Sequence, residues 1–147
     1  MLTIISFLLV IRTNLAYQRW WEASNYYAVM RSKLNDIALQ CSTFTSHTEF
    51  RVEAMRLLML FHGMSLIHLS GRVDPKEEDN FYRQTLVSRE EKHKLNEIGS
   101  GPLLVMRWLQ DHIVEHNEQK VFEVEGPILG RTMQLISMCR EAWNSCR

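Results

Sequence analysis

The sequence has little glycine, proline or cysteine and no excess of charge of either sign. Six glycines and three prolines among 147 residues leave few places where a helix must end, which favours long helices. The three cysteines are odd in number and lack a framework spacing, so we expect free thiols and a reducing compartment. Lys+Arg and Asp+Glu total 17 each, which excludes the basic excess that general nucleic-acid binding requires.

Charge is also absent from residues 1–11, MLTIISFLLVI, and every charged residue of the chain follows them. This run is too short to span a bilayer alone, since a membrane helix needs about 20 apolar residues. A secretory signal peptide is not indicated either, because Arg12 and Arg19 follow the run and no basic residue precedes it. We expect the run to be the second half of a transmembrane helix in a truncated chain. A buried segment of a soluble helix is the alternative that periodicity leaves open.

The rest of the pattern predicts an all-α fold. Glycine and proline are absent before residue 45, so one helix can run over residues 1–44, about 66 Å at 1.5 Å per residue. A break near Ala23 or Ser24 is the alternative. A helix that leaves a bilayer and continues into a cytosolic helical bundle accounts for the length. Further helices are predicted over residues 46–70, 88–98, 102–117 and 126–142, and no alternating strand pattern occurs.

Two helix starts are indicated by capping boxes, in which a hydroxyl and a carboxylate bond to free backbone N–H groups. Ser46 with Glu49 fits this pattern, and so does Ser88 with Glu91. Residues 76–87 are charged and only weakly periodic, so no helix is predicted there.

The most distinctive segment follows the apolar run. Arg12 and Arg19 lie seven residues apart on one helical face, and they mark the cytosolic side under the positive-inside rule. Arg19 and Glu22 are close enough along a helix to pair. A surface helix with two chance tryptophans is the alternative reading. Three amphipathic aromatic residues, typical of a membrane interface, lie at the same level: Tyr17, Trp20 and Trp21.

Residues 7–22 resemble the signature of the bestrophin family of anion channels, in its bacterial and protist branch. That signature reads F-R-T-N-x-x-Y-x-R-W-W-E, and Ile11 stands here where the family has phenylalanine. Weaker similarity continues in the family's order at residues 90–95, 125–129 and 146–147. The signature residues of this chain are Arg12, Asn14, Tyr17, Arg19, Trp20, Trp21 and Glu22.

The resemblance implies a homopentameric, multi-pass membrane channel that passes chloride and other monovalent anions, with no enzymatic step. Residues 1–20 would be the C-terminal part of the second transmembrane helix, which lines the pore. Residues 21–147 would be a cytosolic helical domain that ends just before the next membrane segment. The implied partners are further copies of the chain, the lipid bilayer and the anions. The family's calcium clasp lies in segments outside these motifs, so no cofactor is assigned to the chain.

The resemblance also implies two constrictions in the pore. The family's neck is lined by three side chains one turn apart, and these positions correspond to Thr3, Phe7 and Ile11. Such a spacing places them on one helical face, although Thr3 is polar where the family usually has an apolar residue. The second constriction, at the cytosolic exit, corresponds to Ile128. Alternatively, Ile128 is a core residue of the last helix, in the stripe Ile128, Thr132, Leu135, Cys139 and Ala142.

One motif indicates a different class of protein. His112, Glu115 and His116 match H-x-x-E-H, in which two histidines share Zn²⁺ and the glutamate acts as general base. A zinc-dependent hydrolase is therefore an alternative, beside a soluble helical interaction module whose apolar N-terminal helix packs against a partner. The hydrolase needs a third ligand, and the acidic residues downstream stand in no recognisable context: Glu123, Glu125 and Glu141.

Overall fold

The computed structural model describes residues 2–71, 74–122 and 124–146. These residues form six helices and no strand, which confirms the predicted all-α fold. The helices are α1 (Leu2–Thr43), α2 (Thr48–Ser70), α3 (Pro75–Gln84), α4 (Arg89–Glu97), α5 (Gly101–Glu118) and α6 (Gly126–Ser145).

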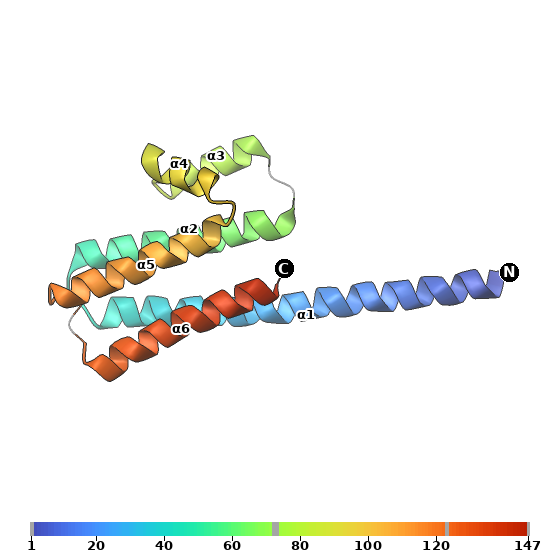
Figure 1. The fold of residues 1–147 in the computed structure, drawn as a ribbon, viewed down its shortest axis with the longest axis horizontal. Coiled ribbons are helices and arrows are strands. Elements are labelled where there is room, and N and C mark those ends of the chain that lie inside the picture. The colour runs from blue at the N-terminus through green and yellow to red at the C-terminus, as the bar shows by residue number, and fades with distance from the viewer. Residues whose placement is uncertain (1, 72–73, 123, 147) are drawn as a thin grey trace.

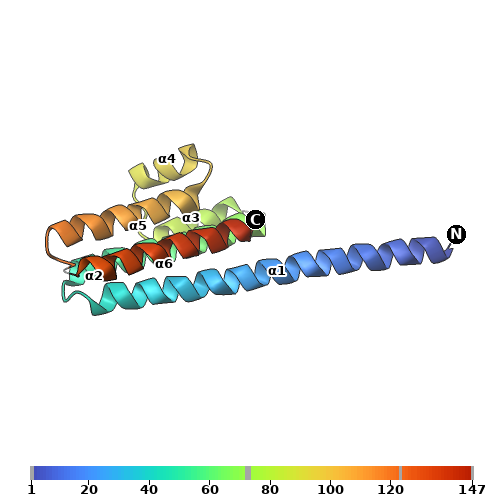
Figure 2. The same cartoon turned by 60° about the horizontal axis from the view of Figure 1, so that its bottom comes forward.

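The four long helices, α1, α2, α5 and α6, form an antiparallel bundle (Figure 1). Helix α1 packs mainly against α6, and α2 packs mainly against α5. The two short helices, α3 and α4, lie on the side of α2 and α5 that is away from α1. The first half of α1 extends alone beyond the bundle in both views (Figure 2).

The second half of α1 is held in the bundle by one apolar face, whose residues recur at spacings of four, three and four. Helix α6 lies along this face. The Cys139 thiol is 3.7 Å from the Met30 carbonyl oxygen, and the Cys146 thiol is 3.7 Å from the Ala23 carbonyl oxygen. Both thiols are free, as predicted, and they lie between α6 and α1. The buried residues of α1 are Met30, Leu34, Ile37 and Cys41.

Helix α2 packs mainly against α5 and also contacts α1 and α3. Among the described residues it is the one helix that is long and apolar enough to cross a membrane, judged by length and composition. One apolar face of α2 fills the core against α5 and α1, as expected for an amphipathic helix of a bundle. Gly71 follows it with a φ of 61°, a left-handed conformation that suits glycine. The buried residues of α2 are Phe50, Ala54, Leu57, Leu58, Leu60, Phe61 and Ser65.

The capping box predicted at residues 46–49 is not formed, so that prediction was wrong. Instead, α2 begins after His47, which makes no side-chain cap. The buried Thr45 hydroxyl lies 2.7 Å from the Val121 carbonyl oxygen, to which it donates, and it accepts the His47 N–H at 3.1 Å. These two hydrogen bonds hold the turn before α2 in a geometry that differs from that of a capping box.

The capping box predicted at residues 88–91 is confirmed. The Ser88 hydroxyl accepts the Glu91 N–H at 3.1 Å, and the Glu91 carboxylate accepts the Ser88 N–H at 2.8 Å. Both bonds are local to the first turn of α4, which explains why the sequence alone predicts them.

Helix α3 forms where the sequence predicts no helix. The Asp74 carboxylate accepts the Lys76 N–H at 2.9 Å and caps the helix start, with Pro75 in the first turn. Tyr82 is buried, and the Phe81 ring lies where a Cβ on Gly63 of α2 would be. Contact of these aromatic rings with the bundle therefore stabilises a helix whose remaining surface is charged.

Candidate functional site

Helix α1 has two halves that differ in what surrounds them. Every described side chain from Thr3 to Glu22 is exposed, and we call residues 3–22 the free half. From Ala23 onward the helix is partly covered by the bundle, and no break occurs at Ala23 or Ser24. The free half therefore continues the axis of the packed half. Its exposed large apolar side chains are Ile4, Ile5, Phe7, Leu8, Leu9, Val10, Ile11 and Leu15.

The three expected neck positions lie on one side of the free half. At about 100° per residue, Thr3 and Ile11 lie about 40° to either side of Phe7. Met30 and Leu34, which face the bundle, lie about 140° and 180° from Phe7 by the same count along the unbroken helix. The neck positions therefore project from the side of α1 opposite the bundle.

The aromatic signature residues form a cluster on the free half. The Tyr17 ring centroid lies 5.9 Å from that of Trp20 and 6.4 Å from that of Trp21, and the two tryptophan rings are 6.3 Å apart. These distances are in the range at which aromatic rings attract each other. The cluster is exposed, so it presents its aromatic surface to the surroundings of the chain. In the described part of the chain no ion pair joins Arg19 to Glu22, a pairing that the sequence permits.

The remaining signature residues divide between the two sides of the helix. Arg12 and Arg19 lie about 140° and 120° from Phe7, toward the bundle side, whereas Asn14 lies about 20° from Phe7. Both arginines therefore point away from the side that carries the expected neck.

Ile128, expected at the second constriction, lies at the opposite end of α1 from Phe7. It is 37% exposed in the first turn of α6, whereas the other four residues of its stripe are buried. One turn later, the Thr132 hydroxyl lies 2.8 Å from the Gln40 side-chain oxygen, which holds the start of α6 beside the end of α1. Phe7 and Gln40 are about 50 Å apart along the helix axis. The two expected constrictions are therefore separated by most of the length of α1.

The histidines of the H-x-x-E-H motif have packing roles. His112 Nε2 donates to the Phe50 carbonyl at 3.3 Å, and the two rings stack with centroids 4.8 Å apart. His116 Nδ1 donates to the His112 carbonyl at 2.8 Å. Burial lowers the pKa of His112, which favours its neutral form. The described residues include no group of three or more His, Cys, Asp or Glu suited to hold a metal ion, and Glu123 lies outside them.

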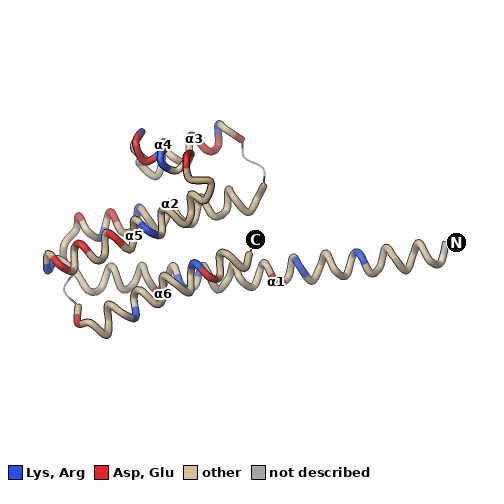
Figure 3. Tube along the Cα trace, in the orientation of Figure 1, with Lys and Arg blue, Asp and Glu red and all other residues tan. Residues whose placement is uncertain are grey.

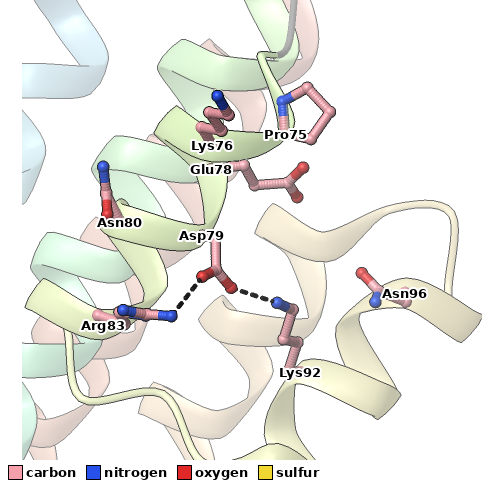
Figure 4. A pocket seen from close by; sticks show the side chains of 8 residues that line it. All are labelled: Pro75, Lys76, Glu78, Asp79, Asn80, Arg83, Lys92 and Asn96. Carbon is pink, nitrogen blue, oxygen red and sulfur yellow. Dashed lines mark hydrogen bonds and ion pairs between the residues drawn. The ribbon is translucent and has the colours of Figure 1, made fainter.

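A polar pocket between α3 and α4 is a feature that the sequence analysis missed (Figure 4). Arg83 and Lys92 both point at Asp79, with nitrogen–oxygen distances of 3.1 Å and 2.8 Å. The hydrogen bond from Lys92 is the main cause that lowers the pKa of Asp79. Asp79 already pairs with both cations, and its ion pair with Lys92 joins α3 to α4. An anion could bind the two cations only by displacing the Asp79 carboxylate.

The sequence analysis also missed an apolar groove on the outer side of α2. Val52, Met55 and Met59 line it together with Leu86 from the turn after α3. Their spacing of three and four along α2 is the signal that predicts a second apolar face. Two cationic side chains, Arg51 and Arg56, also line the groove.

Figure 3 shows how charge is distributed over the same elements. Acidic and basic residues gather on α3, α4 and α5, whereas the part of α1 that lies beyond the bundle carries few charges. The free half carries three charged residues, Arg12, Arg19 and Glu22, and it is the most exposed apolar part of the described chain.

Comparison with known proteins shows what the chain is similar to. The family described as bacterial/fungal bestrophin protein matches residues 2–146. A voltage-dependent anion channel-forming protein of Nostoc sp. is 27% identical over 115 residues, which cover 75% of this chain and 36% of the relative. A protein of the same name from Synechocystis sp. is 22% identical over 149 residues, covering 97% and 46%. The chain thus spans less than half the length of each relative. No solved structure matches it.

Proposed function

Because the chain belongs to the bacterial and fungal bestrophin family, we propose that it is part of a subunit of a membrane channel that conducts anions. In this proposal, residues 1–20 are the C-terminal part of a pore-lining transmembrane helix. Residues 21–147 are a cytosolic helical domain that precedes the next membrane segment. The channel is a homopentamer with one central pore, and chloride and other monovalent anions pass through it without a chemical step.

The observation that carries the proposal is the rotation of the neck positions relative to the bundle. Phe7 projects from one side of α1, and Met30 and Leu34 contact the bundle about 140° to 180° away. A helix of this kind can stand beside a central axis with its bundle directed outward. Five copies then bring five Phe7 and five Ile11 side chains together at the axis, and the bundles do not clash with one another.

The exposed free half supports placement in a membrane. Phe7 is 65% exposed and Leu8 is 59% exposed in the single chain, and apolar surface of this extent is covered by lipid or by protein in a stable assembly. The exposed Tyr17, Trp20 and Trp21 cluster follows this apolar stretch, as an aromatic belt does at a membrane interface.

A neck of Phe7 and Ile11 rings gates by excluding water. Stacked apolar rings offer no hydrogen-bond partners, so a narrow neck dewets and the hydrated anion meets a barrier. Thr3 adds a ring of hydroxyl groups, which can hydrogen-bond to water. The barrier to a hydrated anion is therefore weaker at the Thr3 ring than at the Phe7 and Ile11 rings. Ile128 forms the second constriction about 50 Å further along α1, at the cytosolic end.

Anion flux into liposomes that contain the full-length protein tests the proposal. Replacement of both Phe7 and Ile11 by Ala widens the neck, and the channel should then conduct without its normal stimulus. The matched control replaces Leu8 and Leu9 by Ala, because these residues lie about 100° and 200° around the helix from Phe7. The control should weaken packing and leave gating unchanged.

Three outcomes would count against the proposal. Absence of anion flux through the unaltered protein refutes the channel function. Constitutive flux through the Leu8 and Leu9 variant, with normal gating of the Phe7 and Ile11 variant, shows that the helix is rotated and the neck assignment is wrong. Recovery of the protein in the supernatant without detergent favours a soluble helical interaction module.

A further inference from the structure

The side of α1 that carries the expected neck continues as a line of uncharged polar residues. Between Phe7 and residue 35, every position that returns to within about 20° of Phe7 carries an amide or a hydroxyl group. All of these side chains are exposed. The next position on the line is Asp36, the first charged residue there, and it lies 3.4 Å from Lys33. We call the following residues the polar line: Asn14, Gln18, Asn25 and Ser32.

The charged residues of the same segment lie on other sides of the helix. Arg12 and Arg19 are about 140° and 120° from Phe7, and Arg31 is about 120° away in the opposite direction. Glu22, at about 60°, is the charge nearest to the line. A solvent-exposed helical face usually carries charged residues, as the charged α3 and α4 do here. The absence of charge along this line therefore needs another explanation.

The side-chain amides of the polar line do not stabilise the fold of the single chain through hydrogen bonds. In the described residues, the side chains of Asn14, Gln18 and Asn25 make no hydrogen bond to another residue. These side chains lie on the same side of α1 as Phe7, so they point away from the bundle. They are therefore available to a molecule outside the chain.

On the basis of the proposed channel function, we propose that Asn14, Gln18 and Asn25 line the conduction path on the cytosolic side of the neck and donate amide N–H groups to passing anions. In a pentamer each position becomes a ring of five amides, about 5, 10 and 21 Å beyond Ile11 along the helix axis. An anion that has lost hydration water in the apolar neck regains hydrogen-bond donors there. Because amides carry no net charge, they lower the barrier without retaining the anion.

Charge substitution separates this lining from an ordinary solvated surface. Asn25→Asp and Gln18→Glu keep the size of each side chain and place five carboxylates around the path. A ring of carboxylates repels an anion in the path, so anion flux through the full-length channel in liposomes should fall at least about tenfold. On a surface remote from the path, the added charges are screened beyond about 8 Å at physiological ionic strength, and flux should not change.

The matched control is Asn35→Asp. Asn35 is exposed on the same helix, about 80° around from Phe7, and it should leave anion flux at the level of the unaltered channel. Asn25→Lys provides a substitution of opposite sign and should keep anion flux at or above that level. Unchanged flux in both Gln18→Glu and Asn25→Asp overturns the proposal, and so does an equal fall in Asn35→Asp.

The neck variant distinguishes failure of this inference from failure of the channel proposal. If the unaltered protein does not conduct, the proposed function itself fails. If the Phe7 and Ile11 double variant conducts constitutively while the acidic variants of the polar line conduct normally, the neck assignment stands. Only the lining role of the amides is then wrong.

Discussion

The two halves of α1 form one continuous helix in opposite surroundings. The packed half buries Met30, Leu34, Ile37 and Cys41 along one face and leaves the other face to water. The free half carries apolar side chains around its whole circumference up to Ile11, and all of those described are exposed. A helix that meets a bundle on one side needs only one apolar face, whereas a helix apolar all round suits apolar surroundings on every side. The packed half is therefore part of the folding unit, whereas the free half leaves its apolar side chains exposed in the single chain.

The largest expected effect on stability distinguishes two tryptophans, one in the bundle and one in the free half. Trp143 is fully buried in α6, whereas Trp20 is 61% exposed on the free half. Trp143→Ala should lower the free energy of unfolding of this chain by about 3–5 kcal/mol, since it removes a large buried ring. Trp20→Ala should lower it by less than about 0.5 kcal/mol. Chemical denaturation in mild detergent, followed by circular dichroism, measures both. Equal losses would mean that the free half is part of the folding unit.

An intermediate effect on the free energy of unfolding is expected when two arginines, Arg56 in the bundle and Arg19 on the free half, are compared. Arg56 joins α2 to α4, with its Nη2 2.6 Å from Glu53 and 2.7 Å from Glu91. Arg56→Met leaves the partly buried Glu91 carboxylate without this partner and should cost about 1–3 kcal/mol at pH 7. Arg19→Met, on the free half, should change the free energy of unfolding by less than about 0.5 kcal/mol. Denaturant unfolding of both variants provides the comparison.

The pH dependence of the Arg56 effect follows from Glu91. Burial raises the pKa of Glu91, but the hydrogen bonds from Arg56 and the Ser88 backbone outweigh burial, so the pKa lies below its ordinary value of 4.5. A pKa that is lower in the folded state contributes stability above about pH 4.5, and this contribution is lost as pH falls through the folded value. The difference between wild type and Arg56→Met should therefore shrink at pH 3. The same difference at pH 7 and pH 3 would contradict the assignment.

The smallest effect distinguishes two serines outside the free half that have the same sequence motif. Ser88→Ala removes the cap on α4 and should cost about 1 kcal/mol. Ser46→Ala should have no measurable effect on the free energy of unfolding, because Ser46 makes no cap on α2. Thermal or denaturant unfolding of the two variants tests this, and a loss at Ser46 equal to that at Ser88 would show that the 46–49 capping box forms in solution.

Predictions that depend on neighbouring residues were confirmed by the structure. The unbroken α1 follows from a segment without glycine or proline, and the start of α4 follows from Ser88 and Glu91. Predictions that compete with distant contacts were not. The box at residues 46–49 is replaced by the bond of Thr45 to Val121, and α3 is stabilised where Phe81 meets Gly63. Both partners are far away along the chain, so a local pattern contains no information about them.

The sequence by itself determined the helical phase of α1, because an unbroken helix relates every residue to every other by a constant rotation. It therefore determined that Phe7 and Asn25 share one side and that Met30 lies on another. Only the tertiary structure decided which side the bundle covers, that the bundle ends near Ala23, and that Ile128 stays exposed beside the end of α1. The physical reason is that rotation along a helix is set by hydrogen bonds four residues apart. The choice of packed face instead depends on how helices distant in sequence bury their apolar surface together.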